Sequence, residues 1–137
     1  MIKYRSLRNW KYQLLETYAI QTDIFPDHNL NMDFVSLTTD GMLVISPGYA
    51  WDGASGPAID TKDIMRGSLV HDALYQLMRK GLLDRWHRKA ADLMLIKVCR
   101  EAGMGKLRLW YVYWGLRIFA GRAARLEKEK SNIYEAP

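Results

Sequence analysis

Four side chains near the middle of the chain have the types and spacing that acid–base chemistry requires. His71, Asp72 and Tyr75 lie within about one and a half turns of a predicted helix, and Asp92 follows on the next predicted helix. If the two helices pack antiparallel, we expect Asp92 to reach His71, fix the tautomer of its ring and stabilise its protonated form. We also expect Tyr75, one turn after His71, to donate its hydroxyl to the same carboxylate.

These residues define a candidate hydrolytic site. His71 would act as general base on a water molecule while Asp92 orients the ring and Tyr75 supports the pair. Asp72, together with Asp52 or with backbone carbonyls of a glycine-rich loop, would bind an oxygen-seeking cation such as Ca²⁺, which polarises a substrate carbonyl. Successive side chains on a helix diverge by about 100°, so we do not expect Asp72 to pair with His71 itself.

A purely structural interpretation accounts for the same residues. His71, Tyr75 and Asp92 would form a buried, satisfied network that specifies how two helices pack. The small pair Gly67-Ser68, one turn before His71, leaves space that either a ligand or a neighbouring helix can occupy. A zinc site on His71 and His87 is disfavoured, because no cysteine stands at the spacing of zinc ligands.

The first part of the chain, residues 1–45, has the pattern of a small antiparallel β-sheet. Trp10 to Ile24 is rich in β-branched and aromatic residues, some of which alternate with polar ones. Phe34–Thr38 and Met42–Ile45 flank Asp40-Gly41, which predicts a hairpin closed by a type I′ turn with positive φ at both central residues. Residues 46–60 follow as a glycine-rich loop.

The remainder, residues 61–128, predicts three helices. The first runs from a Thr61 cap to about Lys80, where Gly81 ends it. Asp84 caps a second helix over about 85–102, and a third covers about 107–128, with a frayed tail at 129–137. The chain therefore predicts a single α+β domain over residues 1–137, built from a small N-terminal antiparallel sheet, a glycine-rich loop and three helices.

The third predicted helix carries four aromatic residues in five positions: Trp110, Tyr111, Tyr113 and Trp114. Such a cluster covers more than one face of a helix, so its members cannot all contact one core. We expect some of them to line a pocket, a partner interface or a membrane surface, unless they are core residues with scattered exposure.

Composition and charge narrow the class of protein. Almost half of the residues are hydrophobic, which is typical of a folded domain, and the single Cys99 rules out a disulfide within the chain. Residues 1–61 carry four Lys/Arg against seven Asp/Glu, and residues 62–137 carry sixteen against eight, so the second half is basic. We recognise no nucleic-acid motif and expect no specific nucleic-acid partner.

With no apolar signal segment and no membrane-length apolar run, we expect neither a signal peptide nor a transmembrane helix.

Four motifs occur in an order that resembles a family of phage and prophage proteins, known as domain of unknown function 1353. Members of that family carry similar loop, HDxLY, RxxAD and terminal aromatic segments. In this chain the motifs are Trp51-Asp52-Gly53-Ala54-Ser55-Gly56-Pro57, His71-Asp72-Ala73-Leu74-Tyr75, Arg88-Lys89-Ala90-Ala91-Asp92 and Trp114-Gly115-Leu116-Arg117-Ile118-Phe119-Ala120-Gly121. The resemblance implies a phage or prophage origin, with the protein in the host cytoplasm or in the virion.

A second, local resemblance is to secretory phospholipases A2, above all the small bacterial ones. They share a glycine-rich acidic loop, an HDxxY helix and an aspartate on an antiparallel helix. The resemblance implies that His71 is the general base, that Asp72 binds Ca²⁺ with loop carbonyls, and that Asp92 orients His71 with support from Tyr75.

Two functional expectations follow. One is a phage component, either tail-associated in the virion or a host-interaction factor, whose partners are other virion proteins or host-envelope lipid. The other is a Ca²⁺-dependent, phospholipase A2-like or other envelope-directed hydrolase that uses a His71–Asp92 dyad.

Overall fold

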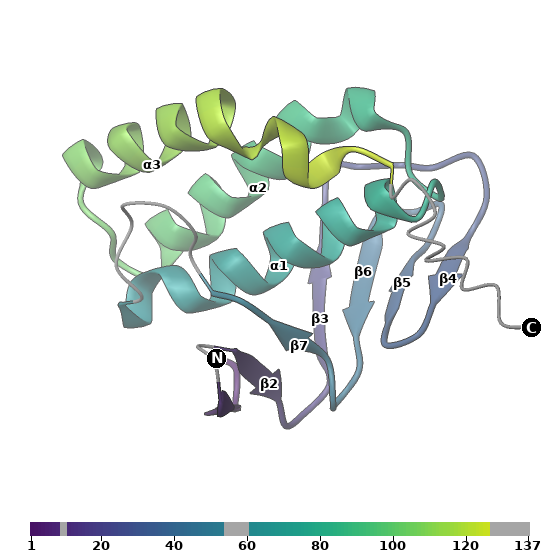
Figure 1. Ribbon diagram of the computed structural model, residues 1–137, viewed down its shortest axis with the longest axis horizontal. Helices are drawn as coiled ribbons and strands as arrows, with labels where there is room; N and C mark the ends of the chain where they lie inside the picture. Colours follow the sequence, from purple (N-terminus) through teal and green to yellow (C-terminus); the bar gives the residue numbers. More distant parts are fainter. Residues whose placement is uncertain (9–10, 54–60, 127–137) are drawn as a thin grey trace, which may run out of the picture.

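The computed structural model describes residues 1–8, 11–53 and 61–126, and it confirms the predicted α+β class (Figure 1). Two small antiparallel sheets come first in the chain, in place of the one sheet that we expected, and three helices follow. The helices are α1 (Lys62–Arg79), α2 (Arg88–Glu101) and α3 (Lys106–Phe119), with 3₁₀ turns η2 (Arg85–His87) and η3 (Ala120–Ala124).

The three-stranded sheet has the order β1-β2-β7, and the four-stranded sheet has the order β3-β6-β5-β4. All of their pairings are antiparallel. The strands are β1 (Tyr4–Ser6), β2 (Tyr12–Leu14), β3 (Tyr18–Gln21), β4 (Leu30–Met32), β5 (Val35–Leu37), β6 (Met42–Ile45) and β7 (Ala50–Trp51). The strand β7 lies inside the predicted loop 46–60, of which residues 54–60 are outside the described residues.

The hairpin between β5 and β6 forms as predicted, but the predicted turn type is wrong. The Thr38 N–H donates to the Met42 carbonyl and the Gly41 N–H donates to the Thr38 carbonyl, which encloses a three-residue loop. Gly41 has a φ of +83°, whereas Asp40 does not have positive φ. This is the loop in which a type I turn is followed by one left-handed residue, so only Gly41 needs the conformational freedom of glycine.

The helix α1 is the centre of the molecule, because it is buried on nearly every side. Its apolar residues join those of both sheets and of α2 in one large hydrophobic cluster. Thr61 occupies the predicted N-cap position, but its hydroxyl donates to the Asp63 carboxylate and does not accept from a backbone N–H. The helix ends at Arg79, and Gly81 follows with a φ of +74°, as predicted for a glycine stop.

The helix α3 is shorter than the sequence predicted. It ends at Phe119 and passes into η3, whereas the expected helix continued to residue 128; residues 127 and 128 are outside the described part. The guanidinium of Arg88 donates to the carbonyls of Leu116 and Arg117, in the last turn of α3. A side chain from α2 thus supplies donors to carbonyls at the end of α3, where the Leu116 carbonyl also accepts from the Ala120 N–H. From there η3 lies against α1. None of the helices in the described part of the chain is long and apolar enough to cross a membrane.

Two glycines inside helices provide a matched test of helix packing. A Cβ on Gly67 of α1 would lie 2.7 Å from the Cys99 Sγ and 3.2 Å from the Leu95 carbonyl, whereas a Cβ on Gly115 of α3 meets nothing within 4 Å. Both changes to alanine gain helix propensity, about 1 kcal/mol. We expect Gly115→Ala to raise the free energy of unfolding by about that amount, and Gly67→Ala to lower it by about 1–3 kcal/mol through overpacking. Urea denaturation measures both; equal effects of the two changes would contradict the packing of α1 on α2.

Candidate functional site

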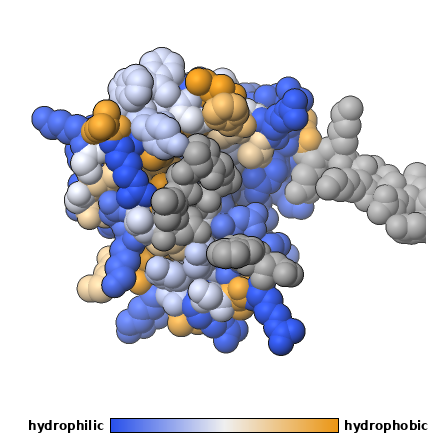
Figure 2. Space-filling model, turned by 60° about the vertical axis from the view of Figure 1, so that its left-hand side comes forward, coloured by the Kyte–Doolittle hydropathy of each residue, from blue (hydrophilic) through white to orange (hydrophobic). Residues whose placement is uncertain are grey.

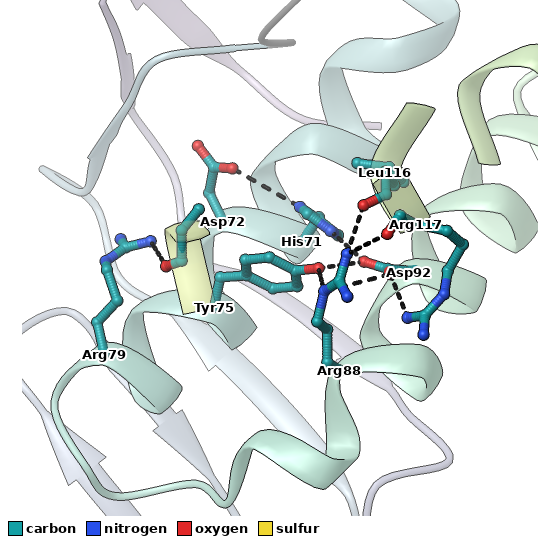
Figure 3. A network of polar contacts seen from close by, with 9 residues as sticks. His71, Asp72, Tyr75, Arg79, Arg88, Asp92, Leu116 and Arg117 are labelled. Carbon is teal, nitrogen blue, oxygen red and sulfur yellow. Dashed lines mark hydrogen bonds and ion pairs between the residues drawn. The ribbon is translucent and has the colours of Figure 1, made fainter. Parts of the chain in front are cut away.

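The carboxylate of Asp92, on α2, is fully buried and joins three helices (Figure 3). Its Oδ1 lies 2.7 Å from the Nε2 of His71 and accepts a 2.5 Å hydrogen bond from the Tyr75 hydroxyl, both from α1. Its Oδ2 accepts from the Nη1 of Arg117 on α3 at 2.9 Å. The predicted contacts of Asp92 with His71 and Tyr75 are therefore present in the folded chain.

Two arginines complete the site, and sequence reasoning gave neither of them a role. Arg117 binds Asp92 directly, and Arg88 donates through Nε to the Tyr75 hydroxyl at 3.1 Å while its Nη2 binds the Leu116 carbonyl at 2.6 Å. Arg88 stands four residues before Asp92 on one helix face, a spacing at which side chains meet, and this signal was present in the sequence. Arg117 carries no such local signal, because its partner is 25 residues away.

The second ring nitrogen of His71 faces a second carboxylate. Its Nδ1 lies 3.9 Å from the Oδ1 of Asp72, so the two neighbours approach more closely than the predicted 100° divergence allowed. His71 itself is only 5% exposed. Burial alone would lower the pKa of His71, but hydrogen bonding and charge from Asp72 and Asp92 outweigh it and raise the pKa above its ordinary 6.5.

The pKa of Asp92 shifts in the opposite direction. Burial would raise it, but hydrogen bonds from His71 and Tyr75, the charge of His71 and the hydrogen bond from Arg117 hold it below its ordinary 3.8. Both shifts favour the charged forms, an imidazolium beside a carboxylate. Removal of one partner from a buried ion pair costs about 3–5 kcal/mol, because the remaining charge is left without compensation.

A cavity of about 560 Å³ opens between α1 and α3, beside this network. At its polar end lie His71, Asp72, Tyr75 and Arg79. Its apolar wall is formed largely by α3, with contributions from α1 and α2: Ile64, Leu95, Trp110, Trp114, Ile118 and Phe119. His71 thus lines the cavity through the small part of its surface that is exposed. Its ring nitrogens face Asp92 and Asp72 within the protein.

The predicted metal ligands are only partly brought together. Asp52 is exposed and Asp72 is partly exposed, and both carboxylates, after burial, help to raise the pKa of Tyr49. Within residues 1–8, 11–53 and 61–126, no group of three or more His, Cys, Asp or Glu side chains could hold a metal ion. That finding concerns side chains alone, whereas the expected calcium site also used backbone carbonyls of the glycine-rich loop, of which residues 54–60 are outside the described part. The calcium site therefore stays a prediction.

The small pair before His71 has two separate uses. Gly67 admits the neighbouring helix, since α2 places Cys99 and Leu95 against it. Ser68 lines the cavity, and its hydroxyl accepts from the indole N–H of Trp51 at 3.0 Å and donates to a backbone carbonyl. Cys99 is buried in the apolar contact between the helices, and burial raises the pKa of its thiol to about 12, as expected of a core residue.

Comparisons with known proteins add no relative: no protein-family model, curated protein or solved structure matches this chain. The two resemblances therefore depend on the sequence motifs alone.

The opposite pKa shifts of His71 and Asp92 predict how the pair contributes to stability as pH changes. Because the pKa of His71 is raised on folding, its contribution is fully present below about pH 6.5 and is lost as pH rises through the folded value. Because the pKa of Asp92 is lowered, its contribution is lost only as pH falls below about 3.8. We expect the destabilisation caused by His71→Gln, measured by urea denaturation, to be largest below about pH 6.5 and to shrink as pH rises through the folded pKa of His71.

His87→Gln is the matched control for this pH dependence, since His87 lies outside the network and burial lowers its pKa. A difference between wild type and His71→Gln that stays constant over the whole pH range would contradict the charged pair.

Proposed function

We propose that this chain is a small phage- or prophage-encoded protein, either tail-associated in the virion or a host-interaction factor, that binds an apolar chain of a host-envelope lipid. The single observation that carries the ligand proposal is the cavity between α1 and α3, with an apolar wall and a charged end. The phage origin is inferred from the four ordered motifs in the sequence.

The cavity has the properties of a site for an amphiphile. Its volume of about 560 Å³ is in the usual range of small-molecule sites. Trp110, Trp114 and Ile118 offer apolar surface, while His71, Asp72 and Arg79 offer charges of both signs at one end. A ligand with an apolar chain and a polar head matches both parts of the cavity. Its chain would contact the apolar wall, and its head would find hydrogen-bonding and charged partners at the other end, so that no polar group is buried without a partner.

The sequence motifs and the site coincide. Three of the four motifs contribute side chains to the Asp92 network: the HDALY, RKAAD and WGLRIFAG segments supply His71 and Tyr75, Arg88 and Asp92, and Arg117. From the fourth motif, Gly53 lines the cavity. This coincidence supports a functional centre in which the network fixes α3 beside α1 and so keeps the cavity open.

Substitutions at Gly115 test the cavity without removing a polar group. Gly115 lines the cavity and has open space at its Cβ position. We expect Gly115→Phe to fill this space and weaken binding of an apolar fluorescent probe, 1-N-phenylnaphthylamine, by about tenfold. Gly115→Ala is the control and leaves the probe affinity unchanged, since a methyl group takes little of the volume. Fluorescence titration measures both, and equal affinity of the two variants would refute the cavity as the binding site.

Ester hydrolysis is a second candidate, favoured by the 2.7 Å contact of the His71 Nε2 with the Asp92 Oδ1. Above its raised pKa, His71 would take a proton from water at Nδ1 while the hydroxide oxygen bonds to the ester carbonyl carbon. The ring would then return that proton to the leaving alkoxide, which gives an acid and an alcohol. Asp92 and Tyr75 would orient the ring, and no step is assigned to Ca²⁺.

Release of fatty acid from mixed phospholipids, with and without added Ca²⁺, tests hydrolysis. We expect wild type to release fatty acid at a rate that increases with pH through the raised pKa of His71, because only the neutral ring accepts a proton. His71→Gln should abolish this release, whereas His87→Gln, at a half-buried position beside Trp86 and outside the network, should not alter it. Equal background rates for all three proteins at every pH would exclude the enzymatic candidate while leaving probe binding as the test of the first proposal.

A further inference from the structure

The helix α3 has apolar residues on two faces, and only one of them is covered. Leu109 and Val112 are buried against α1 and α2, in a cluster with Ile64 and Leu95. A second set of apolar residues faces solvent, and their spacing of three, four, seven and eleven residues places them in one line along the helix. We call this set the exposed stripe: Leu107, Trp110, Tyr111, Trp114 and Ile118.

The exposed stripe is too large to be ordinary surface scatter. Its five side chains are between 46% and 81% exposed, and Phe119 beside it is 73% exposed. Figure 2 shows pale aromatic and orange aliphatic side chains gathered at the top of the molecule, where Figure 1 places α3. Contiguous apolar surface of this kind marks a site of contact with a partner or a membrane.

The charges around the exposed stripe favour a negatively charged partner. Residues 102–126 contain five Lys or Arg and no Asp or Glu. Lys106 at the start of α3, and Arg122 and Arg125 just after its end, are exposed. Tryptophan and tyrosine prefer the boundary between lipid headgroups and acyl chains, and basic side chains at the ends of such a helix bind anionic headgroups.

From these observations we infer that α3 docks flat on an anionic lipid bilayer, with the exposed stripe in the headgroup–acyl boundary. The 14 residues of α3 span about 21 Å, and the helix lies in the plane of the surface. The inference rests on the proposed function in one respect: every residue of the stripe except Leu107 also lines the cavity. Docking through the stripe therefore brings the cavity to the bilayer from which its ligand would come.

Vesicle co-sedimentation of the full chain tests the docking. We expect wild type to bind vesicles of equal parts phosphatidylcholine and phosphatidylglycerol at least about tenfold more tightly than vesicles of phosphatidylcholine alone. Leu107→Glu places a charge in the stripe outside the cavity lining, at the first turn of α3, where a carboxylate favours the helix. It should weaken binding to the anionic vesicles by about tenfold.

Leu93→Glu is the matched control, since Leu93 is an exposed leucine on α2, outside the stripe, and the change should leave vesicle binding as in wild type. Equal loss in both variants, or no binding of wild type to anionic vesicles, would overturn the docking. Self-association that disappears in Leu107→Glu, without vesicle binding by wild type, would also overturn it and assign the stripe to a second copy of the chain.

Probe binding in solution keeps the two proposals distinguishable. If wild type binds 1-N-phenylnaphthylamine but no vesicles, the result supports the cavity as a ligand site and refutes the docking. If wild type binds anionic vesicles through the stripe but does not bind the probe, the result supports the docking and refutes the proposed ligand site.

Discussion

The arrangement of the helices depends on how one fully buried carboxylate is satisfied. Asp92 would be costly to bury alone, so each of its oxygens needs partners within the protein. Those partners come from α1 (His71 and Tyr75) and α3 (Arg117), and Arg88 extends the network to the backbone of α3. The apolar contacts bring the helices together without fixing their rotation, whereas these hydrogen bonds form only at one relative position. The shape of the cavity is a consequence of that position.

The fold could be predicted from sequence where the signal was local. Glycine stops after helices, the hairpin around Asp40-Gly41 and the α+β class all depend on residues close together in the chain. The pairing of β7 with β2 could not be predicted, because β7 has only two residues and its partner lies far upstream. The end of α3 was predicted too late, and the side chain that donates to the carbonyls of its last turn is Arg88, a residue on another helix.

The candidate site likewise has contacts that local sequence signals predict and contacts that they do not. The contacts of His71 and Tyr75 with Asp92 were predictable, because helical spacing places the first two on one face and a buried acid requires partners. Arg117 and the cavity were not, since they depend on how α3 crosses α1. The aromatic cluster of α3 did indicate that more than one helix face is apolar, and the structure separates those faces into a buried one and an exposed one.

The pairing of β2 with β7 also constrains the order in which the chain folds. It joins Gln13 to Ala50, and the chain between them forms the entire four-stranded sheet. Closing so long a loop costs conformational entropy, unless the intervening residues have already brought its ends together. The larger sheet does so, because β3 and β6 pair antiparallel next to the two ends. We therefore expect β7 to pair with β2 after the larger sheet has formed, whereas β1 and β2 are neighbours in the chain and can pair without it.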